Sequence, residues 1–197
     1  MRETRDPGTI RPTAVREVVA EAVTAIDRAA AGSVDEAIHD ALAAVGSALA
    51  VDRAYLVAYD FVSGTCHNTH EWCGEAIEPQ IALLQAFPLH LVPEWVARHR
   101  LGEPMDVADV LALPPDSGVR QTLEPQGIKS LTTVPLMDGS TCVGFIGFDA
   151  VRRLRDFGSR EHAVLHGLAD ALVRAHARLG RGVPDRDPSS VAHHPVR

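Results

Sequence analysis

Two strand–turn–strand segments constrain the fold of this chain more than any other feature of its sequence. The first pairs residues 53–61 (RAYLVAYDF) with 65–73 (TCHNTHEWC) across a Ser63-Gly64 turn. The second pairs 129–136 with 141–149 across an Asp-Gly turn, a dipeptide that favours positive φ. Both are rich in aromatic and aliphatic residues that suit a pleated surface. Hairpins of this kind predict a mostly antiparallel sheet.

Helical segments stand on either side of these hairpins. Residues 13–31 are predicted as one helix, and residues 34–49 as a second helix that begins with a Ser33–Glu36 capping box. The last helix is predicted from Ser159, as its cap, to Gly180. Apolar residues of the first and last helices step by three and four, the spacing of a heptad seam: Val15, Val19, Ile26, Leu165, Leu168, Leu172 and Leu179.

The middle of the chain predicts shorter elements. We expect helical pieces around Ile77–Ala86, Glu94–Leu101 and Gly118–Gln126, and a short strand at 105–107. The order of elements therefore predicts an α+β fold, in which a central antiparallel sheet of five to six strands is packed against helices.

Composition limits where the chain acts and what it binds. A net charge of −7 argues against nucleic-acid or anionic-membrane binding, which needs clustered positive charge. No apolar run is long enough to span a bilayer and the start lacks a signal-peptide core, so a cytoplasmic location is expected. Three cysteines without a CxxC pair are expected to be free thiols. Residues 1–12 and 181–197 are expected to be disordered.

The stretch NTHEWC at 68–73 concentrates residue types that bind metals or move protons. Because side chains alternate across a strand, His67 and His70 are expected on opposite faces. The same alternation divides the strand into Cys66, Asn68, His70 and Trp72 on one face, and His67, Thr69, Glu71 and Cys73 on the other. No set of three or four ligands converges, so no metal site is predicted.

These motifs together resemble the GAF domain, a PAS-related sensory module of bacterial signalling proteins. RAYLVAYD, NTHEWC, PEWV at 93–96, QGIKSLTTVPL at 126–136 and GFIGFD at 144–149 occur in the family's order. The resemblance is to GAF domains attached to histidine kinases and diguanylate cyclases, and it places the domain at 33–180. It implies a sheet with one face toward a cavity that residues 77–127 cover. The first and last helices lie on the other face, where they often pair with a second subunit.

The resemblance turns the candidate residues into two sets. A ligand pocket is expected to include Trp72, His70, Cys73, Trp95, Leu131, Thr133 and Phe148. The heptad positions named above are expected to form a dimer seam. For each tryptophan taken singly, ordinary core packing is favoured over a ligand contact. Cys73 as a bilin anchor is a less favoured alternative because the usual neighbouring histidine pattern is missing.

The predicted function is a non-catalytic, cytoplasmic sensory domain that binds a small-molecule effector and signals as a homodimer to a separate kinase- or cyclase-type partner. The sequence does not identify the effector or any cofactor. Two alternatives stay open, a structural dimerisation module without a ligand and a GAF-type free methionine sulfoxide reductase. The residue spacing for cyclic-nucleotide binding is not met, and neither nucleic acid nor membrane is an expected partner.

Overall fold

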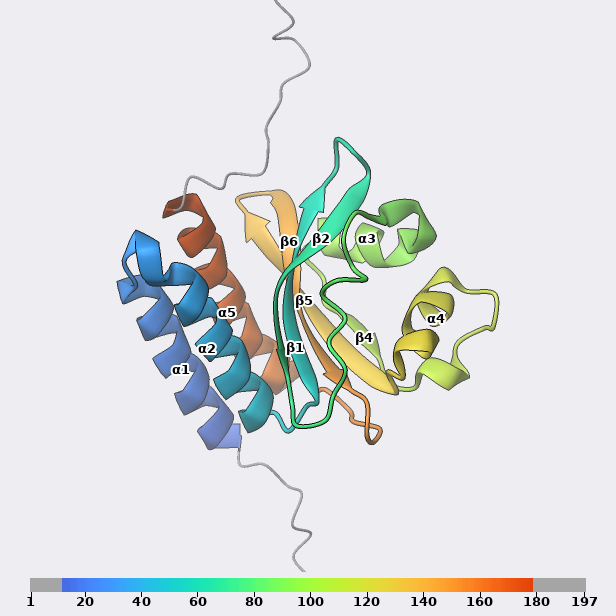
Figure 1. Ribbon diagram of the computed structural model, residues 1–197, viewed down its shortest axis with the longest axis horizontal. Helices are drawn as coiled ribbons and strands as arrows, with labels where there is room; N and C mark the ends of the chain where they lie inside the picture. The colour runs from blue at the N-terminus through green and yellow to red at the C-terminus, as the bar shows by residue number, and fades with distance from the viewer. Residues whose placement is uncertain (1–11, 179–197) are drawn as a thin grey trace, which may run out of the picture.

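In the computed structural model, which describes residues 12–178, one six-stranded sheet organises the whole domain (Figure 1). Its strand order is β3-β2-β1-β6-β5-β4, and every neighbouring pair is antiparallel. Both predicted hairpins are confirmed, as is the short strand near 105. The strands are β1 Arg53–Asp60, β2 Thr65–Cys73, β3 Phe87–Pro88, β4 Met105–Val107, β5 Ser130–Asp138 and β6 Thr141–Ala150.

Three helices cover one face of the sheet and form what we call the helical layer: α1 (Pro12–Arg28), α2 (Val34–Ala48) and α5 (Ser159–Arg178). The helix α2 packs on β1 and β2, α5 packs on β5, and α1 packs on both of these helices. A bidentate ion pair between Arg174 of α5 and Asp27 of α1, at 2.9 and 3.1 Å, holds the outer helix α1 against α5.

The residues predicted to form a dimer seam are buried in contacts between helices of the same chain. Val15, Val19 and Ile26 are buried where α1 meets its neighbours, and Leu165, Leu168 and Leu172 are buried along α5. Leu179 lies outside the described residues, as do the two predicted tails apart from Pro12. A heptad spacing identifies a helical contact but not whether the partner helix belongs to the same chain, and here the contact is intramolecular.

The opposite face is covered by short helices and loops. They comprise η2 (Leu89–Leu91), α3 (Pro93–Arg100), η3 (Val110–Ala112), α4 (Gly118–Leu123) and η4 (Glu124–Gln126). We call residues 74–95 and 118–128 the roof. The helices predicted around 94–101 and 118–126 are confirmed, whereas the helix predicted at 77–86 is wrong. Backbone groups of that segment bond to β2 instead, and the Leu84 carbonyl accepts the Asn68 N–H at 2.9 Å.

Two helix starts also differ in detail from the sequence expectation. Ser33 precedes α2, but its hydroxyl bonds the Ala30 carbonyl rather than the free N–H groups of the helix, so the capping box is not formed. Ser159 is the first residue of α5 rather than its cap. Glu161 accepts the Gly158 N–H at 2.8 Å and so satisfies one donor at that end of the helix.

A bulge in β2 decides which of its side chains face the roof. Leu56 pairs with His70 but Val57 pairs with Asn68, so Thr69 is an extra residue. The insertion puts Asn68 and Glu71 on the same face, where the amide of Asn68 lies 3.5 Å from the Glu71 carboxylate. Strict alternation fails at this point.

Gly46 of α2 gives a test of the packing on the helical side. A Cβ at Gly46 would lie 2.6 Å from the Trp72 indole, whereas Gly167 of α5 has open space beside it. We expect Gly46→Ala to lower the free energy of unfolding by about 1–3 kcal/mol through overpacking. The matched control Gly167→Ala should raise it by up to about 1 kcal/mol through helix propensity. Urea denaturation measures both, and two changes of the same sign would contradict this packing.

Candidate functional site

A small cavity lies between the sheet and the roof. Its volume is about 50 Å³. The sheet contributes Tyr55, Val57, Tyr59, Cys66 and Phe145, and the roof contributes residues from 84–95 and 122–128, among them Trp95 and Gln126. Nearly every lining group is apolar, so the cavity suits a ligand that has little charge.

Packed rings form one wall of this cavity. The Phe145 ring centroid lies 5.5 Å from that of Tyr59, 5.8 Å from that of Trp95 and 4.9 Å from that of His99. Rings at such separations pack favourably in tilted and edge-on arrangements. The wall therefore holds α3, which carries Trp95 and His99, against the middle of the sheet.

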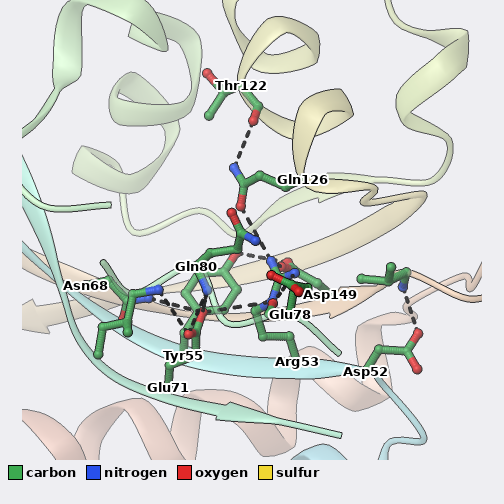
Figure 2. Close-up of polar contacts among 12 residues, drawn as sticks. Asp52, Arg53, Tyr55, Asn68, Glu71, Glu78, Gln80, Thr122, Gln126 and Asp149 are labelled. Atoms are coloured by element: carbon green, nitrogen blue, oxygen red, sulfur yellow. Dashed lines mark hydrogen bonds and ion pairs between the residues drawn. The ribbon is translucent and has the colours of Figure 1, made fainter. Parts of the chain in front are cut away.

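A buried polar cluster adjoins the cavity (Figure 2). We define it as Arg53, Tyr55, Glu71, Gln126 and Asp149. Arg53, only 2% exposed, donates to Asp149 at 3.1 Å and to Gln126 at 3.4 Å. The Tyr55 hydroxyl donates to the other carboxylate oxygen of Asp149 at 3.0 Å. The cluster thus joins β1 and β6 to the roof.

Glu71 fastens the roof to β2. Its carboxylate accepts the backbone N–H of Gln80 at 2.9 Å and that of Ile81 at 3.0 Å, and it lies 3.8 Å from Arg53 Nε. Arg53 also donates to the carbonyl of Glu78 at 3.3 Å. The Ile81 N–H and the Glu78 carbonyl are groups that a helix at 77–86 would bond internally.

The sequence of residues 33–175 matches the GAF domain family. The chain belongs to that family.

Two kinds of relative extend this result. The chain is 34% identical over 152 residues to the methanogenesis regulatory histidine kinase FilI of Methanothrix harundinacea (strain 6Ac), covering 74% of this chain and 17% of that relative. The chain therefore spans about a sixth of the length of this curated relative.

Solved structures with the same fold include GAF domains with bound phycocyanobilin or phycoerythrobilin. The phycoerythrobilin-bound GAF domain from a cyanobacterial phytochrome superposes with a TM-score of 0.68 at 16% identity, covering 85% of this chain and 99% of that one. The chromophore-binding domain of the Stigmatella aurantiaca bacteriophytochrome gives 0.65 at 13% identity, covering 88% and 63%. At these identities the similarity establishes the fold.

Burial dominates the electrostatics of the polar cluster in this GAF domain. It raises the pKa of Asp149, which is 1% exposed, to about 7 against the opposing effect of Arg53. It also raises the pKa of Tyr55 well above its usual value, with the nearby Asp149 carboxylate adding to the effect. One guanidinium faces two carboxylates here, so a single proton on Asp149 makes the group neutral.

A second buried network lies under α3. His99 is fully buried, with Nδ1 2.7 Å from the Tyr59 hydroxyl and Nε2 2.9 Å from the Thr133 hydroxyl. Thr133 donates its only hydrogen to the Met105 carbonyl, so it accepts from His99 Nε2–H, and Nδ1 then accepts from Tyr59. Burial lowers the pKa of His99 to about 3, which keeps the ring neutral.

The structure separates the residues predicted for the pocket. Trp95 lines the cavity. Thr133 faces the roof and bonds to His99. Leu131, two residues earlier on β5, is buried on the same face of the sheet as Thr133. Cys73 ends β2 opposite Arg53, outside the cavity lining.

Three predicted pocket residues lie on the helical side instead, which corrects the expectation. Trp72 packs beside Gly46 of α2, and His70 lies 3.3 Å from Asp35 of the same helix. Phe148 pairs with Thr132, whose hydroxyl contacts His162 of α5. The bulge at Thr69 is the cause for His70 and Trp72, because it exchanges the faces of every residue beyond it.

Sequence reasoning missed the residues that build the site. Tyr55, Tyr59 and Cys66 line the cavity, and Arg53 and Asp149 form the centre of the polar cluster. A signal was present, since two charged residues stand in otherwise apolar strands and such charges are buried only when paired.

Residues 12–178 hold no group of three or more histidine, cysteine or acidic side chains placed to bind a metal ion. No helix in that range is long and apolar enough to cross a membrane. The three cysteines are free thiols, and burial raises the pKa of Cys66 to about 12 and that of Cys142 to about 11.

The raised pKa of Asp149 predicts a pH dependence of stability. A carboxyl whose folded pKa exceeds its unfolded value of 3.8 stabilises the fold fully below pH 3.8 and loses that contribution as the pH rises to about 7. We expect Asp149→Asn, which resembles the protonated acid, to remove this pH-dependent fall in the free energy of unfolding. A pKa shift of this size corresponds to about a few kcal/mol. Denaturant titrations at pH 4, 5.5 and 7 measure it.

His99 contributes with the opposite sign, because its lowered pKa removes stability as the pH falls from 6.5 toward 3. Both the Asp149→Asn variant and the unmutated protein contain His99, so its contribution cancels in the difference between their free energies of unfolding. Parallel stability curves for the two proteins between pH 4 and 7 would show that Asp149 does not take up a proton there.

Proposed function

We propose that this GAF domain is a sensory module in which occupancy of the cavity is transmitted through the sheet to the helical layer. The observation that carries the proposal is the placement of cavity and helices on opposite faces of the same strands. Tyr55 and Val57 of β1 line the cavity. Ala54, their neighbour on the same strand, faces the helical layer and lies beside Gly46 of α2. A ligand that shifts β1 therefore also shifts the surface on which α2 packs.

Such coupling needs an effector that binds two arrangements of the domain with unequal affinity. The helical layer is suited to pass on a movement as a unit, because Arg174 and Arg178 of α5 both bond the C-terminal end of α1, at the Asp27 side chain and at the Ile26 and Asp27 carbonyls. The similarity to a regulatory histidine kinase supports an output of kinase type. A cytoplasmic location is part of the same proposal.

A homodimer remains part of the proposal, but its interface differs from the predicted seam. Because the seam residues are buried within one chain, we propose that two subunits meet through the exposed faces of α1, α2 or α5. Those faces are mostly polar, which fits a contact between domains that is smaller than an obligate dimer interface.

A linear tetrapyrrole does not fit this cavity. Pockets for drug-sized ligands measure roughly 300–1,000 Å³, whereas the cavity is about 50 Å³. Cys73, the candidate anchor, lies outside the lining. We therefore propose a smaller effector than the photoreceptor relatives hold.

Catalysis by cysteine is also outside our proposal. The thiolate is the reactive form, and burial raises the pKa of all three thiols. A structural module without a ligand is the second candidate, since side chains nearly fill the space between sheet and roof.

Native mass spectrometry after incubation with a bacterial metabolite extract tests the proposal. Cys66→Met adds two heavy atoms inside the lining, and Cys73→Met makes the same change outside it. We expect the unmutated protein and Cys73→Met to retain a small molecule in a dimer, and Cys66→Met to lose it. Absence of any retained molecule in all three proteins would favour the structural module, and a monomer at micromolar concentration would contradict the dimer.

A further inference from the structure

The polar cluster sets one positive charge against two carboxylates in a buried place (Figure 2). Arg53 donates to Asp149 at 3.1 Å, and its Nε lies 3.8 Å from the Glu71 carboxylate. All three side chains are buried. Two carboxylates that share a site inside a protein repel each other, which favours a proton on one of them. Neutrality of the cluster therefore requires one bound proton.

The hydrogen bonds assign that proton to Asp149. Both oxygens of Glu71 accept backbone N–H groups of the roof, and an N–H cannot accept a proton from a carboxylic acid. The oxygens of Asp149 meet the Arg53 guanidinium and the Tyr55 hydroxyl. A hydroxyl donates to a carboxylate and accepts from a carboxylic acid, so Tyr55 suits both protonation states of Asp149.

The other groups around Asp149 keep their charge or stay neutral. Those that face it are Arg53 and Tyr55 from β1, Glu71 and Cys73 from β2, Leu131 from β5 and the Gln126 amide from the roof, while Asp52 and Arg152 pair with each other beside it. Burial raises the pKa of Tyr55 and of Cys73, so both remain protonated. Asp149 is thus the member of the cluster that titrates.

The same cluster holds residues 78–81 of the roof. Glu71 accepts the last two N–H groups of this stretch at 2.9 and 3.0 Å, and Arg53 donates to its first carbonyl at 3.3 Å. Residues 74–86, all described, contain no helix or strand that would hold them by its own bonds. A negative charge on Asp149 attracts Arg53 and repels Glu71, so it weakens the bonds to the roof.

We propose that the polar cluster is a proton-binding site that controls the roof, which is held closed at residues 78–81 while the proton is bound and loosens when it is lost. This response needs no effector and so goes beyond the function proposed above. Its sign follows from burial, which raises the pKa of Asp149 to about 7 under the closed roof. An open roof lets water reach the carboxyl and returns its pKa toward 3.8, so opening is favoured as the pH rises.

Amide exchange of the unmutated, ligand-free protein, measured by NMR, tests the proposal. Dividing each exchange rate by its intrinsic rate gives the opening constant. We expect this constant to rise about tenfold between pH 6 and pH 8 for the Gln80 and Ile81 N–H groups, since a site with a pKa of about 7 loses that factor in proton binding over the interval. The rise should persist in exchange that low urea does not accelerate, which separates local opening from unfolding. The Leu111 N–H, bonded to the Asp109 carboxylate at 2.9 Å, is the matched control and should not change.

Two variants and a direct titration complete the test. Asp149→Asn should keep the opening constants at their pH 6 values throughout. Glu71→Gln removes one repelling charge, so the rise should end at a lower pH, whereas a purely structural role of Glu71 would increase opening equally at both pH values. The ¹³C signal of the Asp149 carboxyl should titrate near pH 7 in the unmutated protein. Opening constants of Gln80 and Ile81 that are equal at pH 6 and pH 8, or a tenfold rise that persists in Asp149→Asn, would overturn the inference.

Discussion

The buried guanidinium of Arg53 is the interaction on which this GAF domain depends. A charge removed from water is tolerated only when it is paired and hydrogen-bonded. Arg53 meets that requirement by gathering Asp149 from β6, the Glu78 carbonyl and Gln126 from the roof, with Glu71 of β2 close by. Three strands and both roof segments thereby become parts of one structure, and two members of the cluster, Tyr55 and Gln126, line the cavity.

The sheet acts as a partition with different chemistry on its two sides. The roof side carries the polar cluster, the His99 network and the cavity, while on the helical side α2 and α5 pack mainly through apolar residues, with polar contacts at His70 and Thr132. Adjacent residues of β1 belong to opposite sides, which is why a displacement on one side has a direct route to the other. The bulge at Thr69 adjusts this partition so that Glu71 reaches the roof.

The sequence predicted much of this architecture and less of the site. The hairpins could be predicted because turn residues and strand composition agree locally, and α3 and α4 because proline and glycine mark their starts. The bulge could not be predicted, because one inserted residue leaves no local signature. It puts His70 and Trp72 on the helical side instead of the expected cavity side. The segment 77–86 was misassigned because its backbone bonds to a side chain, Glu71, that lies outside the segment. The heptad spacing was real, but spacing alone does not identify the partner helix.

Hydrogen–deuterium exchange of an Arg53→Met variant tests the central role of Arg53 most directly. We expect faster exchange in residues 74–86 and 124–128, where the bonds from Arg53 and Glu71 end, and unchanged exchange in α1, α2 and α5. The control Arg174→Met, which removes an exposed ion pair of the helical layer, should leave the roof unchanged. Unaltered exchange of the roof in Arg53→Met, or an equal increase throughout the domain, would contradict the account.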